Sequence, residues 1–155
     1  MVNEKVEIID YSEDLKEHIK TLNYEWLKKY FHIEKSDEVS LSNPKEKIID
    51  QGGFIFYAKL CDEIVGTASL LKISDTVYEL GKMAVTQKAQ GNKIGTLLLK
   101  HCLSFLKEKK IKKCILYSNT KLKSALYLYK KYGFTEITLE TGVYERANIK
   151  MENRL

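Results

Sequence analysis

The stretch that decides the fold is "MAVTQKAQGNKIGTLLLKHCLSFLKEKK" at residues 83–110, where a β-type run changes through a Gln/Gly/Asn/Lys loop into an amphipathic helix. At such a junction the first backbone N–H groups of the helix have no partner within it, and the helix dipole leaves partial positive charge there. Glycines let the backbone turn and approach an anion closely. Residues 90–95 therefore either cradle a pyrophosphate or form an ordinary glycine-containing turn.

Composition limits the class of protein. Of the 155 residues, 44% are hydrophobic and 30% charged, which predicts one soluble domain over residues 1–155 with a sizeable core. Cys61, Cys102 and Cys114 lie far apart with no CxxC pair, so we expect neither a metal site nor a disulfide framework. The start "MVNEKVEIID" has no apolar leader segment and no apolar run is long enough to span a membrane. We therefore expect a cytoplasmic protein with no membrane partner.

The net charge of +5 raises the question of nucleic-acid binding. Many of the lysines fall on the polar side of the expected helices, where they would face water. The chain has no helix-turn-helix spacing, RNA-binding aromatic strand or finger pattern, so we expect no nucleic-acid partner. A basic nucleic-acid-binding protein is the weaker alternative, since modest basicity also suits an anionic cofactor or substrate.

Hydrophobic periodicity and turn residues predict the order of elements. The expected helices cover residues 12–31 with Ser12 as the cap, 43–53 with Asn43 as the cap and Pro44 in the first turn, the stretch after the glycine loop, and 122–132. The expected strands cover residues 54–60, 64–73, 77–85, 113–118, and stretches near 134–138 and 144–152, while residues 32–42 are expected to be a polar loop. Antiparallel strands followed by a β-α-β unit indicate a mixed α/β sheet with helices on both faces.

Two segments, "YELGKMAVTQKAQGNKIGTLLLKHCL" and "LYSNTKLKSALYLYKKYGFTEI", resemble the GNAT family, the GCN5-related N-acetyltransferases. The first is similar to the family's strand and acetyl-CoA pyrophosphate loop, written Q/R-x-x-G-x-G/A. Gln90 and Gly95 match this pattern, but Lys93 stands at its middle glycine, where a side chain tolerates positive φ poorly. The second is similar to the family's later strand, an Asn, a helix and a Tyr-x-x-x-Gly-Phe ending.

The resemblance implies a single-domain GNAT fold, a central mixed, mostly antiparallel twisted sheet flanked by helices on both faces. It also implies acetyl-CoA as co-substrate and direct transfer of an acetyl group to a primary amine in a ternary complex. The residues that it implies for acetyl-CoA binding are Met83, Ala84, Val85, Gln90, Gly91, Asn92, Lys93, Ile94, Gly95, Thr96, Asn119, Ala125 and Tyr129. For Asn119, a helix-capping role is the alternative.

A protonated amine must lose a proton before it attacks a thioester, and a carboxylate can relay that proton. Glu79, on the strand leading into the loop, is the candidate base, with water as the relay. The alternative role for Glu79 is to pair with a lysine across the sheet. Glu25, Glu34, Asp37 and Glu38 are rival carboxylates, which could instead attract a cationic acceptor.

The departing thiolate needs a proton or a hydrogen bond, and the resemblance carries the family's acid onto Tyr129. Its spacing with Leu122, Ala125 and Leu126 places Tyr129 on the apolar helical face, so packing is the alternative. We treat Tyr127 as a non-matching neighbour.

The acceptor side is less defined. Tyr24, Trp26, Tyr30 and Phe31 could line an acceptor pocket, although core packing is the stronger interpretation for Trp26. Residues 141–155 could close over the acceptor or form a dimer edge, which leaves a homodimer open. The acceptor is a small-molecule or protein amine, and a non-catalytic acyl-CoA-binding module is the main alternative to an enzyme.

Overall fold

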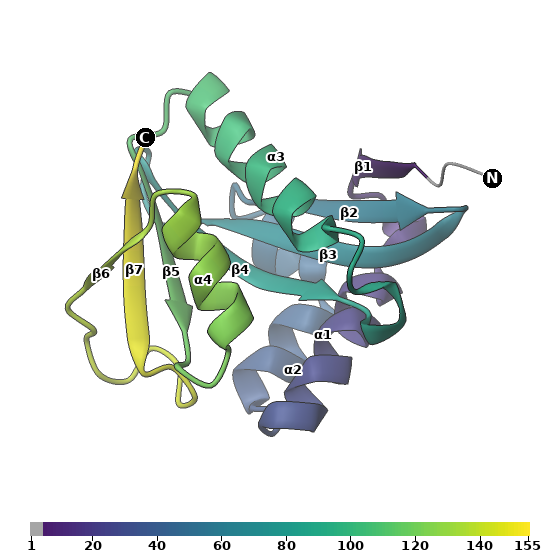
Figure 1. The fold of residues 1–155 in the computed structure, drawn as a ribbon, viewed down its shortest axis with the longest axis horizontal. Coiled ribbons are helices and arrows are strands. Elements are labelled where there is room, and N and C mark those ends of the chain that lie inside the picture. Colours follow the sequence, from purple (N-terminus) through teal and green to yellow (C-terminus); the bar gives the residue numbers. More distant parts are fainter. Residues whose placement is uncertain (1–4) are drawn as a thin grey trace.

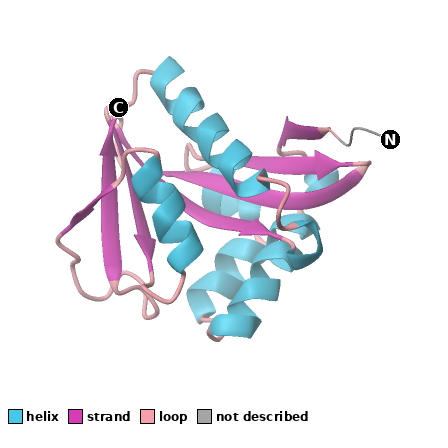
Figure 2. Ribbon diagram, viewed as in Figure 1, coloured by secondary structure: helices cyan, strands magenta, loops and turns pink. Residues whose placement is uncertain are grey.

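The fold is a seven-stranded sheet in the order β1-β2-β3-β4-β5-β7-β6, seen here in a computed structural model that describes residues 5–155 (Figure 1). The first four residues, which the predicted single domain includes, lie outside the described part. Every neighbouring pair of strands is antiparallel except β4 and β5, which are parallel. Figure 2 shows the helices packed around this sheet. The predicted mixed, mostly antiparallel sheet is therefore confirmed.

Most of the expected elements are present, with changed boundaries, and the structure adds one strand and one helix that the sequence analysis did not predict. The strands are β1 (Val6–Asp10), β2 (Phe54–Leu60), β3 (Glu63–Lys72), β4 (Val77–Val85), β5 (Lys113–Ser118), β6 (Thr135–Ile137) and β7 (Ile149–Arg154). The helices are α1 (Glu17–Tyr30), α2 (Lys35–Ser42), α3 (Ile94–Glu108) and α4 (Lys123–Lys131), with short turns η1 (Glu13–Leu15), η2 (Lys45–Ile49) and η3 (Gln87–Ala89).

The expected polar loop at residues 32–42 is wrong, because most of it forms α2. A capping box starts this helix: Glu34 accepts a hydrogen bond from the backbone of Asp37, and the Asp37 carboxylate accepts one from the Glu34 N–H at 3.0 Å. Asn43 then ends α2 instead of capping the next helix, and its side chain donates to the Val39 carbonyl at 2.9 Å. The predicted helix at 43–53 is reduced to the π-helical turn η2 after Pro44.

Both ends of the chain differ from the prediction. Strand β1, which the sequence analysis did not predict, pairs with β2 at the sheet edge. The predicted helix at 12–31 opens with the turn η1, so Lys16 and not Ser12 stands at the cap of α1. The last strand begins only at Ile149, because residues 144–148 belong to the loop between β6 and β7.

Helices cover both faces of the sheet, as predicted. On one face α3 buries Leu98, Leu99 and Leu106 in a cluster with Phe56 and Leu80. On the other face a second cluster joins α1, α2 and η2 to β2, through Ile19, Leu27, Leu41, Ile48, Ile55 and Tyr57. The switch from Ile55 to Phe56 to Tyr57 follows the alternation of side chains along a strand.

Two irregularities in β4 open the middle of the sheet. The parallel ladder pairs Val77–Glu79 with Lys113–Ile115 and then stops, so β4 and β5 diverge beyond Glu79. In the same strand a β-bulge at Lys82 breaks the register with β3, and Lys82 takes a left-handed φ of 50°. The buried Asn23 of α1 holds this bulge, since its Nδ2 donates to the Lys82 carbonyl at 3.1 Å. The divergence and the bulge together shape the space described next.

Candidate active site

A cavity of about 400 Å³ lies between the diverging strands β4 and β5. Its walls come from β4, β5, α1, α2, α4 and the loop between β6 and β7. Of the residues predicted for acetyl-CoA binding and catalysis, those that line it are Glu79, Met83, Ala84, Val85, Gln90, Asn119, Ala125 and Tyr129. Residues 83–85 have no partner strand on the side facing β5, which leaves that edge of the backbone open toward the cavity.

The glycine loop forms a second, adjoining part of the site. Gly91 and Lys93 have φ values of 94° and 58°, so Lys93 occupies the left-handed conformation at the position where the pattern has glycine. The backbone of the loop thus has the conformation expected for a glycine at this position, although the residue is a lysine. A Cβ built on Gly91 would meet nothing within 4 Å, so the surface there is open.

The amides of this loop are available to an anion. The backbone N–H groups of residues 91–96 donate no hydrogen bond within the part of the chain that the structure describes, and the first to do so is that of Leu97, to the Lys93 carbonyl at 3.1 Å. Of the predicted loop residues only Gln90 lines the cavity. The other loop residues lie beside the cavity, at the start of α3. They are Gly91, Asn92, Lys93, Ile94, Gly95 and Thr96. A Cβ on Gly95 would lie 3.5 Å from Met83 Cε, which keeps the two parts in contact.

Glu79 lies in the cavity wall with only 6% of its surface exposed. Its carboxylate accepts a hydrogen bond from the Tyr144 hydroxyl at 2.8 Å. Burial raises the pKa of Glu79, and this hydrogen bond and the positive charges of Lys82 and Lys150 oppose the rise. Glu79 makes no ion pair with any residue between 5 and 155, and its neighbours across the sheet are Leu71 and Ile115. The cross-sheet lysine pair is therefore not formed.

Tyr129 both packs in the apolar core and lines the cavity. Its ring packs against Phe134, with 5.8 Å between ring centroids, and the side chain also lines the cavity. Burial raises the pKa of the phenol to about 12, so it keeps its proton at neutral pH. Its hydroxyl has no hydrogen-bond partner among the described residues, whereas Tyr127 on the same helix is 71% exposed. The hydroxyl is thus a donor available to a group in the cavity.

Asn119 connects the end of β5 with the loop before β7. Its Nδ2 donates to the Arg146 carbonyl at 2.7 Å, and its Oδ1 accepts from the Lys121 N–H at 2.8 Å. Asn119 thus stabilises the turn that leads into α4 and at the same time lines the cavity. Binding of a pantetheine group by Asn119 stays a prediction.

Part of the cavity wall is aromatic. Trp26 and Tyr30 of α1, Phe31 at its end, and Tyr144 from the loop between β6 and β7 line it, whereas Tyr24 does not. The loop carrying Tyr144 is therefore part of the cavity wall. Tyr144 and Arg146 were not predicted as site residues, because no local pattern marks them.

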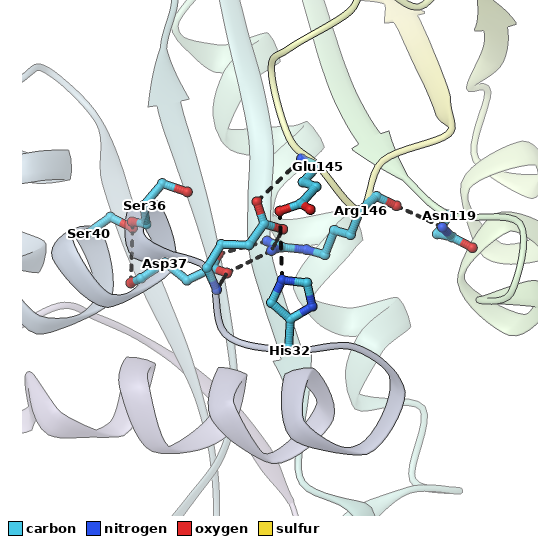
Figure 3. Close-up of polar contacts among 8 residues, drawn as sticks. His32, Ser36, Asp37, Ser40, Asn119, Glu145 and Arg146 are labelled. Atoms are coloured by element: carbon cyan, nitrogen blue, oxygen red, sulfur yellow. Dashed lines mark hydrogen bonds and ion pairs between the residues drawn. The ribbon is translucent and has the colours of Figure 1, made fainter.

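Arg146 fastens this loop to α2 (Figure 3). Its guanidinium donates to both oxygens of Asp37 at 2.7 and 2.8 Å, and to Glu34 at 2.9 Å. It also lies 5.7 Å from the ring centroids of Trp26 and of Tyr144. Asp37 is 1% exposed, so this is a buried, bidentate ion pair.

We call the ion pairs of Arg146 with Glu34 and Asp37 the clamp. None of the rival carboxylates both lines the cavity and lacks a cationic partner in the described chain. Glu34 and Asp37 are both paired with Arg146. Glu25 accepts hydrogen bonds from the Thr86 hydroxyl at 2.9 Å and the Gln87 N–H at 2.7 Å, outside the cavity lining. Glu38 is exposed on α2. Among the predicted carboxylates, Glu79 is the one that lines the cavity without a cationic partner in the described chain.

Among residues 5–155 no group of three or more His, Cys, Asp or Glu side chains is arranged to hold a metal ion. No helix in the described range is long and apolar enough to cross a membrane.

Comparison with protein families matches residues 20–134 to the acetyltransferase (GNAT) family. A solved GNAT-family acetyltransferase from Staphylococcus aureus Mu50 is 26% identical, with a TM-score of 0.87 over 97% of this chain and 99% of that chain. The PaiA N-acetyltransferase from Thermoplasma acidophilum in complex with coenzyme A is 22% identical, with a TM-score of 0.75 over 97% and 99% of the two chains.

A chimera of the spermidine N-acetyltransferase SpeG from Vibrio cholerae and hSSAT is 19% identical, with a TM-score of 0.74 over 96% of this chain and 95% of that chain. At these lower identities the similarity shows the fold alone. Comparison with functionally curated proteins finds no significant match.

We expect a large loss of stability when Asp37, the buried carboxylate of the clamp, is substituted. Asp37→Asn is expected to lower the free energy of unfolding by about 3 kcal/mol or more, because it leaves a desolvated guanidinium without its bidentate partner. Urea denaturation measures this change. Glu145→Gln is the matched control, since Glu145 adjoins Arg146 but contacts only the exposed His32, at 3.7 Å, through its side chain. It should change stability by no more than about 0.5 kcal/mol. Equal losses in both variants would show that the clamp does not hold the loop.

Proposed function

Because the chain belongs to the acetyltransferase (GNAT) family, we propose that it transfers an acetyl group from acetyl-CoA to a primary amine by direct attack in a ternary complex. The observation that carries this proposal is a single cavity that holds both a buried carboxylate without a cationic partner in the described chain, Glu79, and a free phenol, Tyr129. The first suits the removal of a proton from an amine. The second suits the delivery of a proton to a leaving thiolate.

The adjoining loop supports the choice of acetyl-CoA as donor. Its consecutive free amides at residues 91–96 lie at the start of α3, where the helix dipole favours a pyrophosphate. The open edge of residues 83–85 would hydrogen-bond the pantetheine arm and polarise the thioester carbonyl. The thioester would then lie near Glu79 and Tyr129, since all these residues line one cavity.

The reaction follows from these positions. Glu79 accepts the proton of the bound ammonium, through water, and the free amine attacks the thioester carbonyl carbon. A C–N bond forms, and the negative charge on the tetrahedral intermediate is stabilised by backbone donors of β4. The intermediate collapses with cleavage of the C–S bond, and the Tyr129 hydroxyl protonates the departing thiolate. The attacking nitrogen, positively charged after the C–N bond forms, loses its second proton through water, which restores the Tyr129 hydroxyl, and Glu79 releases its proton to solvent. The products are the N-acetylated amine and free CoA.

Calorimetry and a CoA-release assay together test this function. Acetyl-CoA should bind the purified protein, and release of free CoA should depend on an added amine. Binding of acetyl-CoA without amine-dependent release across small amines, amino acids, polyamines and peptides would indicate a non-catalytic acyl-CoA-binding module. Absence of acetyl-CoA binding would refute the proposal outright.

Glu79→Gln is expected to lower turnover by roughly 10²- to 10⁴-fold, the range for a positioned base, with little change in acetyl-CoA affinity. Burial raises the pKa of Glu79, so wild-type activity should fall as the pH drops through that raised value, and the variant should lack this acidic limb. The measurement is kcat/KM against pH. Glu38→Gln, which alters an exposed rival carboxylate, should keep the wild-type profile.

Stability separates a catalytic from a structural effect at Glu79. Because its folded-state pKa is raised, its carboxyl stabilises the fold when protonated and loses that contribution as the pH rises. Glutamine remains neutral and still accepts the Tyr144 hydrogen bond, so Glu79→Gln should melt no lower than wild type at neutral pH. A variant that melts normally and keeps full turnover would exclude Glu79 as the base.

Tyr129→Phe removes the hydroxyl and keeps the ring that packs on Phe134. We expect near-normal melting and acetyl-CoA binding, with turnover lower by roughly 10²- to 10⁴-fold. Single-turnover kinetics, in which chemistry limits the rate, measure this loss. Tyr127→Phe is the control, because Tyr127 is exposed on the same helix. Full turnover in a stable Tyr129→Phe protein would mean that the thiolate leaves without this acid.

A further inference from the structure

Lys82 lies in the cavity and has no part in the reaction described above. It stands at the β-bulge of β4, with a left-handed φ of 50°, and its carbonyl is held by Asn23 at 3.1 Å. In a regular strand, residues three apart point to opposite faces of the sheet. The bulge adds one residue, so Lys82 and Glu79 both line the same cavity. The bulge is therefore what brings a cation to the side of the candidate base.

The ammonium of Lys82 has no hydrogen bond or ion pair within the described part of the chain. The nearby carboxylates have other partners: Asp37 is bound by Arg146, and Glu79 by Tyr144. Burial lowers the pKa of Lys82, and the negative charges of Asp37 and Glu79 oppose this effect without contacting the ammonium. A half-buried cation without a contacting partner is unfavourable in the empty protein. An anion entering the cavity would supply that partner.

We propose that Lys82 binds an anionic group on the acceptor, and that the acceptor is an amine with a carboxylate beside it, as in a free α-amino acid. The inference rests on the proposed function, because it takes Glu79 as the group that receives the proton of the amine. An α-amino acid presents an ammonium and a carboxylate on one carbon, which matches a carboxylate and an ammonium on one strand of the cavity wall. A simple amine would leave Lys82 without a partner.

The remaining walls indicate what the rest of the acceptor is made of. The cavity lining includes the aromatic side chains of Trp26, Tyr30, Phe31 and Tyr144, so an apolar or aromatic side chain fits against them. Asp37, the other carboxylate that lines the cavity, is held by Arg146 and is not available to a second positive charge on the acceptor. The acceptor class is therefore an α-amino acid with an apolar or aromatic side chain.

The test compares three acceptors that differ only at the carboxylate. Phenylalanine, phenylalanine amide and phenethylamine are assayed by CoA release, with the corresponding tryptophan and leucine sets. Wild type should favour the free amino acid over its amide and its decarboxylated amine by about ten- to a hundredfold in kcat/KM, the range for a charge-assisted hydrogen bond. Lys82→Met should remove this preference, mainly by raising KM for the amino acid. The amines should be unaffected or improved when the assay is run at a pH above the acidic limb, because loss of the Lys82 charge also raises the pKa of Glu79.

Lys100→Met is the matched control, since Lys100 is exposed on α3 away from the cavity lining, and it should keep the wild-type preference. A second measurement does not depend on turnover: calorimetry of free amino acid binding to the protein saturated with CoA, which should weaken about tenfold or more in Lys82→Met.

The outcomes separate the inference from the function on which it rests. Equal use of amino acid, amide and amine by wild type, or an equal loss for all three in Lys82→Met, would overturn the assignment of Lys82 while the transferase function stands. No CoA release with any amine, together with unchanged amino acid binding in Lys82→Met, would overturn both.

Discussion

The site depends on the point at which β4 stops pairing with β5. A parallel ladder that ends after Glu79 leaves residues 83–85 with an open edge inside the sheet, in a position that no regular sheet provides. Open edges normally attract other strands. Here α4 and the loop between β6 and β7 cover the gap, so the edge faces a cavity and not solvent. The cavity lined by the candidate base, Glu79, and the candidate acid, Tyr129, follows from this one divergence.

The loop between β6 and β7 is held in the cavity wall by charges that are far apart along the chain. Arg146 pairs with Asp37 across a loop and several elements, and the same loop places Tyr144 against Glu79. A buried ion pair gives little net stability over an apolar contact of the same size, because both ions lose their hydration. Its bidentate geometry does, however, set the position of the loop. The clamp therefore acts mainly to fix where Tyr144 lies.

The sequence was sufficient to predict the elements whose signal lies in their own residues and the turns beside them. Strands β2, β4 and β5 match the predicted residues 54–60, 77–85 and 113–118, because their apolar runs end in clear turn residues. Helix α2 escaped prediction because its capping box uses Glu34 and Asp37 in place of the usual Ser or Thr, and because few of its residues are buried. The sequence did not establish the path of the glycine loop, because a lysine at the middle glycine tolerates positive φ poorly. The structure shows that Lys93 takes the left-handed conformation of a glycine.

The acceptor side could not be predicted in the same way. Nothing near Lys82 in the sequence marks a bulge, since the extra residue becomes visible only in the register with β3. Tyr144 and Arg146 matter because of partners that lie far away in the chain. The raised pKa of Glu79 and the lowered pKa of Lys82 show that the fold disfavours the charged form of each. A chain selected for stability alone would replace both with apolar side chains, so adaptation to heat and retention of activity would pull these two positions in opposite directions.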